Sequence, residues 1–193
     1  MKKLLLALFA LLMFAAVPAM ADTETDYIKS IIEVGYDYSK VGFESAVSYG
    51  DSRTVENFIK SGYNPNMKIA GVPVTFCAVI NEKPATLDVL LANGADANAT
   101  VGKVTLLASA IKLKNTQLVN VLLKHKADVN KPSMGLTPLN MALLYKNIEM
   151  SKLLIKSGAV VDNASLRYAK RTKDTVFIEY IYNIYNKGMK LER

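Results

Sequence analysis

The feature that most constrains the fold of this chain is an internal repeat with a period of 32 residues. One column of the repeat is alanine in every copy, at Ala46, Ala78, Ala110 and Ala142. A second column is glycine in three copies and lysine in one, at Gly62, Gly94, Lys126 and Gly158. A third column consists of Asn66, Asn98, Asn130 and Asp162. Three columns that keep one period over four copies indicate units that stack, each packing on its neighbours.

The fourth copy indicates how one unit folds. Thr137 and Pro138 have the residue types of a helix N-cap and first helical position. Apolar residues then recur at helical spacing within 139–143 and again within 150–154. Gly158 follows the second run, where a left-handed residue ends a helix at least cost. Each unit is therefore predicted to be a pair of helices that buries its apolar face only by stacking, with the alanine column allowing close approach.

These residues resemble the ankyrin-repeat family. Residues 137–142, T-P-L-N-M-A, are similar to the family signature T-P-L-H-x-A, with Asn140 in place of histidine, and segments 94–98 and 126–130 resemble its G-A-D-x-N turn. The copy at 105–110 lacks the proline, the copy at 73–78 departs further, and the first copy keeps only the helices. The resemblance covers about residues 25–185. It implies an all-α ankyrin-repeat solenoid of stacked helix-turn-helix units with short β-hairpin-like fingers.

The spacing also predicts where the units begin and end. Both terminal units are five residues shorter than the period, which is expected of caps that have a single neighbour. Val176, Ile178 and Ile181 are expected to supply the last apolar face. The predicted division is an N-cap at 22–42, repeats at 43–66, 67–98, 99–130 and 131–162, a C-cap at 163–186 and a basic tail at 187–193.

Residues 1–21 have the layout of a secretory signal peptide. Two lysines precede an apolar run from Leu4 to Val17, and Ala19-Met20-Ala21 is a small-x-small cleavage site. The alternative, a membrane anchor, needs about 20 apolar residues to cross the bilayer, and this run is shorter. We expect cleavage after Ala21, a periplasmic or secreted location, and no stable membrane insertion afterwards.

The composition leaves little room for catalysis. One histidine and one cysteine cannot form a common Cys/His metal site or a disulfide framework, so no metal or cofactor and no enzymatic activity are expected. His125 is predicted to be a solvated helix end. Cys77 is predicted to be a buried small hydrophobe, with a redox thiol as the alternative. The basic C-terminal residues are interpreted as a solvated helix rather than a nucleic-acid site.

The resemblance implies that recognition uses a concave face formed by the finger tips and the exposed ends of the first helices. Counting from each repeat alanine, the helix-end positions are Tyr49, Ile80, Asn81, Lys112, Leu113, Leu144 and Tyr145. The finger positions are Ile69, Val72, Val101 and Met134. Such a row of apolar and aromatic side chains is typical of a protein-binding stripe. The alternative is that the fingers simply pack on one another, with Val104 and Leu136 facing inward.

The functional hypothesis is therefore an exported, non-enzymatic module that binds a partner protein through this concave face. Inhibition or protection of an envelope enzyme is one form that this function could take. The alternative is a secreted effector that acts on a host protein. The partner is expected to be another protein and not a nucleic acid, and the chain is expected to be a monomer.

Overall fold

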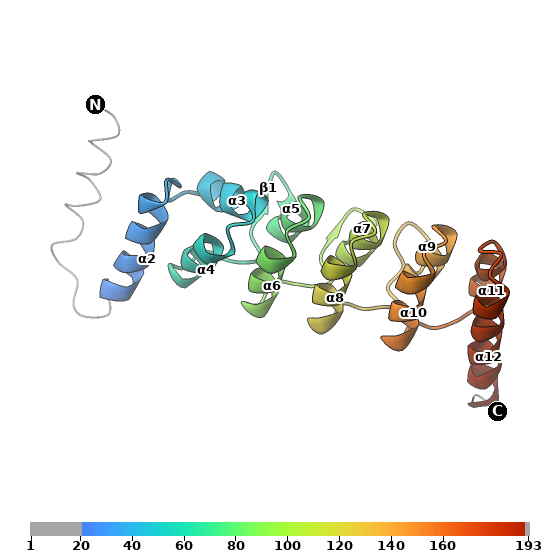
Figure 1. Cartoon of the computed structure of the whole chain (residues 1–193). Coiled ribbons are helices and arrows are strands. Elements are labelled where there is room, and N and C mark those ends of the chain that lie inside the picture. The colour runs from blue at the N-terminus through green and yellow to red at the C-terminus, as the bar shows by residue number, and fades with distance from the viewer. Residues whose placement is uncertain (1–20, 192–193) are drawn as a thin grey trace.

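The computed structural model describes residues 21–191 of the 193-residue chain. The predicted signal peptide lies outside the described residues, apart from Ala21. Figure 1 shows helices α3, α5, α7, α9 and α11 in one row, and α4, α6, α8, α10 and α12 in a second row beside it. Each helix of the first row packs against the next, from α3 to α11. The predicted all-α solenoid of stacked helical pairs is thus confirmed.

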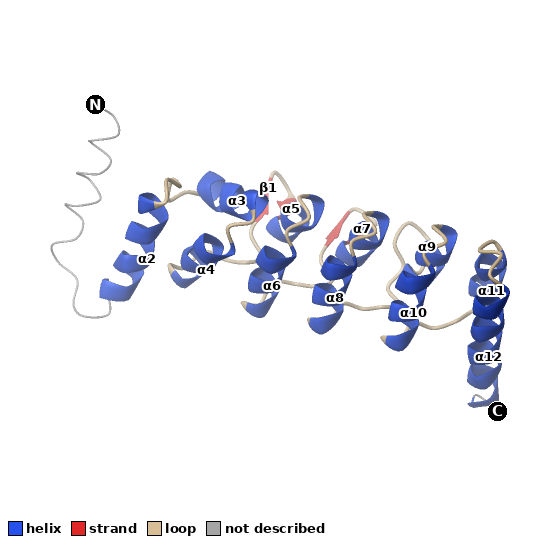
Figure 2. Ribbon diagram, viewed as in Figure 1, coloured by secondary structure: helices blue, strands red, loops and turns tan. Residues whose placement is uncertain are grey.

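The helices and strands of the described residues follow one another regularly. The helices are α2 (Ala21–Glu33), α3 (Lys40–Tyr49), α4 (Ser52–Lys60), α5 (Val74–Ile80), α6 (Pro84–Ala92), α7 (Leu106–Lys112), α8 (Thr116–Lys124), α9 (Pro138–Leu144), α10 (Ile148–Lys156), α11 (Asn163–Lys170) and α12 (Thr175–Leu191). The strands are β1 (Lys68–Ile69), β2 (Val72–Pro73), β3 (Thr100–Val101) and β4 (Val104–Thr105). Figure 2 shows these strands as short fingers that precede α5 and α7.

Local side chains determine where the helices begin. Thr137 accepts a hydrogen bond from the Asn140 amide, and Pro138 occupies the first turn of α9, as predicted. Thr105 caps α7 in the same way. In the copy that departs most from the signature, Pro73 stands at the N-cap of α5 and offers no side-chain hydrogen bond.

The repeat alanines hold the two rows of helices together. All four are fully buried, at Ala46, Ala78, Ala110 and Ala142. A larger side chain would separate the helices of each pair, because a packed interior has little space for an added methylene group. The core is therefore continuous along the stack, from Ile31 in α2 to Ile181 in α12.

The asparagine column joins neighbouring units on the loop side. Asn66 accepts a hydrogen bond from the Asp96 amide and donates one to the Gly94 carbonyl. Asn98 and Asn130 repeat these two contacts with the following unit. The amide side chain can do this because it carries both a donor and an acceptor. This column therefore has a structural role, which the spacing located but did not explain.

The C-terminal end differs from the sequence expectation. Of the three residues expected on the buried face, Ile181 is fully buried as expected, Ile178 is half-buried and Val176 is 77% exposed. Phe177 takes the place of Val176 and is almost fully buried. Asp174 accepts a hydrogen bond from the Phe177 amide and so sets where α12 starts. The i, i+4 pair 177 and 181 then faces the stack. Helix α12 continues without a break to Leu191, so no change of secondary structure marks a tail at residue 187.

Candidate functional site

The predicted helix-end residues lie at equivalent places in four successive helical pairs. We call them the helix-end group: Tyr49, Ile80, Asn81, Lys112, Leu113, Leu144 and Tyr145. Each lies in the last turn or at the C-cap of a first-row helix. Because α3, α5, α7 and α9 pack side by side, these positions form one row along the stack. Every member is exposed except Leu144, which is half-buried.

The large apolar members of this row face solvent to an unusual degree. Tyr49 is 75% exposed and Ile80 is 62% exposed. Leu113 and Tyr145 are each a little under 40% exposed. A single exposed apolar residue needs no explanation, but here one recurs at the end of four successive first-row helices, with Ile80 one position earlier in its unit than the other three.

The predicted finger residues lie at the other end of the first-row helices. We call Ile69, Val72, Val101 and Met134 the finger group. Ile69 and Val72 face each other across β1 and β2 and are both half-buried against the core. Val101 and Met134 are exposed, at 37% and 68%. The first finger therefore packs against the core, whereas Val101 and especially Met134 in the later two present apolar surface to solvent.

The distance between the two groups follows from helix length. Helices α5, α7 and α9 each contain seven residues. At about 1.5 Å per residue, each helix spans roughly 10 Å. The fingers precede these helices and the helix-end group terminates them, so the candidate surface is about one short helix wide and four units long.

The turn at the tip of the finger that precedes α9 uses a backbone conformation that is unusual for its residue type. Met134 has a φ of 52° and is followed by Gly135 at 81°. A left-handed conformation is uncommon outside glycine, asparagine and aspartate. This turn places the Met134 side chain outward rather than against the core.

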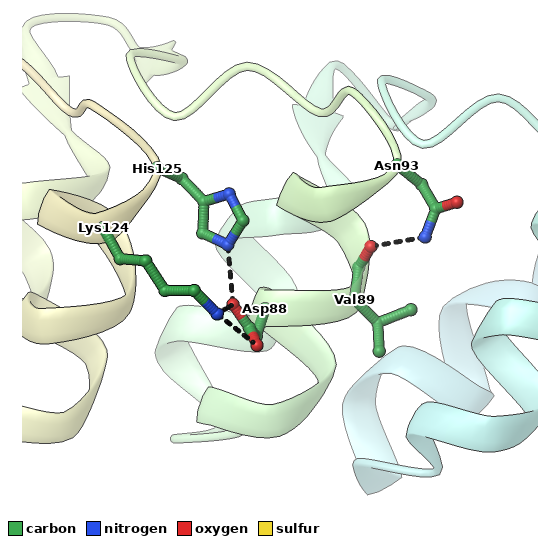
Figure 3. Close-up of polar contacts among 5 residues, drawn as sticks. All are labelled: Asp88, Val89, Asn93, Lys124 and His125. Atoms are coloured by element: carbon green, nitrogen blue, oxygen red, sulfur yellow. Dashed lines mark hydrogen bonds and ion pairs between the residues drawn. The ribbon is translucent and has the colours of Figure 1, made fainter.

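His125 is not the solvated helix end that the sequence predicted. It forms the C-cap of α8, and its side chain is only 18% exposed. Its Nε2 lies 2.6 Å from Oδ1 of Asp88 in the neighbouring helix α6, and Lys124 Nζ lies 2.9 Å from the same oxygen (Figure 3). Hydrogen bonds from Lys124 and His125 hold the pKa of Asp88 below its usual value. The sequence places these residues 37 positions apart, so only the stacking of α6 on α8 brings them together.

Cys77 has the surroundings of a structural residue. It lies in α5, is half-buried and packs against the core. Burial, followed by the charge of Glu44, raises the pKa of its thiol. A reactive thiol needs the opposite shift, since the thiolate is the nucleophile. These observations favour the prediction of a small buried hydrophobe over a redox role.

The part of the chain that the structure describes has neither a metal-binding cluster nor a membrane-spanning helix. Within residues 21–191, no group of three or more His, Cys, Asp or Glu side chains lies close enough to hold a metal ion. In the same part of the chain, no helix is both long and apolar enough to cross a bilayer. A shallow hollow of about 480 Å³ lies between α12 and the loop at 159–163, away from both groups of candidate residues.

Comparison with known families agrees with the geometry. A family model for ankyrin repeats, containing three copies, matches residues 43–133 and again residues 75–165. Together these matches cover well over half of the chain. No curated protein matches it.

Proposed function

The chain belongs to the ankyrin-repeat family, and we propose that it is an exported, non-enzymatic module that binds a partner protein through its helix-end and finger groups. The observation that carries this proposal is the row formed by Tyr49, Ile80, Leu113 and Tyr145. Proteins of this family generally serve as binding scaffolds for other proteins. Exposed apolar side chains that recur at the ends of four successive helices are the feature expected of such a scaffold.

The mixture of side chains on the candidate surface supports a protein as the partner. Apolar and aromatic side chains alternate along it with polar ones such as Asn81 and Lys112. Interfaces between proteins combine buried aromatic or aliphatic anchors with a polar rim in this way. The raised pKa of the Cys77 thiol disfavours a nucleophilic role for this residue.

The binding surface is tested by replacing three anchors together, Tyr49→Ala, Leu113→Ala and Tyr145→Ala. Partner capture is measured by cross-linking in living cells, followed by mass spectrometry. We expect at least a tenfold loss of the captured protein, because centrally placed anchors contribute more than about 1 kcal/mol each.

A matched control variant removes the same number of exposed apolar side chains from elsewhere on the surface. Ile32→Ala, Val160→Ala and Val176→Ala remove three exposed residues that lie outside both groups. This control should capture the partner normally. Equal capture by the triple variant and the control would reject the helix-end group as the binding surface.

Export is the second part of the proposal, and it is supported by the composition of residues 1–21. Cell fractionation with mass spectrometry of the N-terminus should find a chain that begins at Asp22 in the periplasm. A full-length chain in the cytoplasm would contradict export. Accumulation in the medium would instead favour a secreted effector acting on a host protein over a periplasmic inhibitor or protector.

A further inference from the structure

Charge is distributed very unevenly along the stack. Residues 97–148 contain one carboxylate, Asp128, and seven lysines, at positions Lys103, Lys112, Lys114, Lys124, Lys126, Lys131 and Lys146. The preceding residues 43–96 contain six carboxylates and four basic side chains. By unit, residues 99–130 carry five lysines and one carboxylate, and residues 131–162 carry four lysines and two carboxylates. Residues 43–66 and 67–98 each carry one carboxylate more than they carry basic side chains.

Several of these lysines already have partners. Lys124 pairs with Asp88 at 2.9 Å, and Lys131 donates a hydrogen bond to the Asn98 carbonyl. Four others are exposed near the candidate surface and form no ion pair with the residues that the structure describes: Lys103, Lys112, Lys114 and Lys146. Lys112 ends α7, while Lys114 and Lys146 follow the C-caps Leu113 and Tyr145.

The nearby carboxylates are engaged elsewhere. Glu82 accepts a hydrogen bond from the Asn115 side chain at 2.9 Å. Asp128 accepts one from the Asn130 amide in its own turn, and Glu149 pairs with Lys152. None of them forms an ion pair with the four exposed lysines in the part of the chain that the structure describes. Glu82 keeps its negative charge, but four lysines beside it leave this surface net positive.

Helix stability explains only part of this arrangement. A lysine at a helix C-terminus interacts favourably with the helix dipole, which accounts for Lys112 and its equivalents at helix ends. Lys103 lies instead in the turn between β3 and β4, where no helix ends. Packed helices lie about 8–10 Å apart, which is close to the Debye length of about 8 Å at physiological salt. Salt therefore screens the repulsion between Lys114 and Lys146 only in part.

We infer that the partner presents an acidic segment in which carboxylates alternate with apolar or aromatic side chains. The inference rests on the proposed function, and it specifies the chemistry of the partner at the third and fourth units. The partner's carboxylates would meet Lys112, Lys114 and Lys146 together with Lys103 from the finger. Its apolar side chains would pack on Leu113, which lies between Lys112 and Lys114 in the chain, and on Tyr145, which directly precedes Lys146.

A protein segment fits this surface better than a nucleic acid does. Lysine ammonium groups attract carboxylates and phosphates alike, so the choice between the two partners rests on the apolar side chains of this surface. Large exposed apolar side chains beside each lysine are suited to a peptide that carries both kinds of group.

The test uses three fluorescein-labelled peptides of 12 residues. They share tyrosine or leucine at every third position, and the remaining positions are all Glu, all Gln or all Lys. Binding to the full mature chain is measured by fluorescence anisotropy at low and at physiological salt. We expect the Glu peptide to bind about tenfold or more tightly than the Gln peptide, and this difference should shrink as salt rises.

Two matched variants locate the effect on the surface. Lys112→Gln, Lys114→Gln and Lys146→Gln together should weaken binding of the Glu peptide about tenfold. Lys156→Gln, Lys173→Gln and Lys187→Gln remove the same charge from exposed sites outside the candidate surface and should leave binding within about twofold. Thermal unfolding of both variants, followed by circular dichroism, verifies that they are folded.

The outcomes separate this inference from the proposed function. Equal binding of the Glu and Gln peptides, no binding of any peptide, or equal losses in both lysine variants would overturn the acidic partner. Tighter, lysine-dependent binding of a 20-nucleotide single-stranded DNA or of phosphatidylglycerol vesicles would also overturn it. In each case the proposed function stands if cellular capture still depends on Tyr49, Leu113 and Tyr145, and it fails as well if capture does not.

Discussion

The two ends of the stack are closed by different interactions. At the N-terminal end, four aromatic rings form one cluster: Tyr38, Phe43, Phe58 and Tyr63. The Phe58 ring lies 5.0 Å from Tyr63 and 5.4 Å from Phe43 between ring centres. The Tyr38 hydroxyl adds a polar contact by donating to the carbonyl of Ser61, the C-cap of α4, at 2.8 Å.

At the C-terminal end a buried polar network links the last units. Asn140 in α9 is 3% exposed, and its side chain accepts a hydrogen bond from the Ser165 hydroxyl and donates to Asp162. Asp162 also caps α11 by accepting from the Ser165 amide at 2.7 Å. Asn140 occupies the position where the ankyrin signature has histidine, so this departure coincides with a specific contact to the next unit.

This difference teaches how a stack of similar units can end in two ways. Aromatic burial is not directional and depends on the area removed from water. A buried network requires every member to be satisfied and fails when one is removed. The N-terminal end should therefore depend on ring volume, and the C-terminal end on the identity of single polar atoms.

The largest expected effect comes from removing the central ring of the aromatic cluster. Phe58→Ala should lower the free energy of unfolding by about 3–5 kcal/mol, because it removes a fully buried side chain and leaves a cavity. Hydrogen exchange should then lose protection in α2, α3 and α4. The matched variant Phe177→Ala should lose it in α11 and α12 instead, and identical exchange patterns would show that the ends are not distinct.

A smaller loss is expected from the polar network. Asp162→Ala removes the cap of α11 and leaves Asn140 with one partner fewer, which should cost about 1–2 kcal/mol. Chemical denaturation followed by circular dichroism measures this loss. Asp162→Asn retains a capping oxygen and should recover part of the stability, while Glu179→Ala at an exposed site should change it little. If Glu179→Ala cost as much, the loss would be due to charge rather than to the network.

A change in the middle of the stack provides an internal reference. Lys126 has a φ of 63° in a column where Gly62, Gly94 and Gly158 have values between 90° and 97°. Lys126→Gly should raise the free energy of unfolding by up to about 1 kcal/mol, because glycine adopts this conformation without steric cost. Gly94→Ala should lower it. A loss of stability in Lys126→Gly would mean that the lysine side chain contributes more than its backbone costs.

The smallest expected effect is a different pH dependence of stability at the two ends of the stack. Burial raises the pKa of Asp162, but hydrogen bonds from Ser165 and Asn140 outweigh it and lower the pKa. The unfolded state then binds more protons below about pH 4, so this contribution is complete above that pH and is lost as the pH falls through the folded value. Burial, and next the charge of Tyr38, raises the pKa of Tyr63. Its contribution is complete below about pH 10 and is lost as the pH rises through the folded value.

Exchange protection measured across pH checks this prediction. In acid, α11 should lose protection before α4, and in alkali the order should reverse. The variants Asp162→Asn and Tyr63→Phe should each abolish the response at its own end only. Simultaneous loss of protection at both ends in acid and in alkali would contradict the comparison.

Most of the fold could be predicted from the columns of the repeat. They located the buried alanines, the helix starts at Thr105 and Thr137, and the left-handed positions that include Lys126. The burial of α12 was predicted less well, since Val176 proved exposed and Phe177 buried. A helical phase can be assigned from sequence only when the first residue of the helix is known, and here the cap at Asp174 determined it.

Counting from the repeat alanines located the residues of the candidate surface, but the sequence did not predict how far each side chain is exposed. Tyr49, Ile80 and Met134 face solvent, whereas Ile69, Val72 and Leu144 are half-buried. The sequence offered no means of separating these two sets, because neighbouring fingers decide how much of each side chain is covered. The lysines of residues 97–148 were visible in the sequence, and their number alone would have pointed to a basic surface.

By itself, the sequence determined that this chain is a stack of helical pairs, because each 32-residue unit has apolar residues at helical spacing in two segments and can bury them only against its neighbours. Only the tertiary structure decided which residues from different units meet. Asp88 and His125 are 37 residues apart, and Asn140 and Ser165 are 25 apart. Such pairs depend on how one unit packs on the next, and the local preference of each segment for helix or turn does not determine that packing.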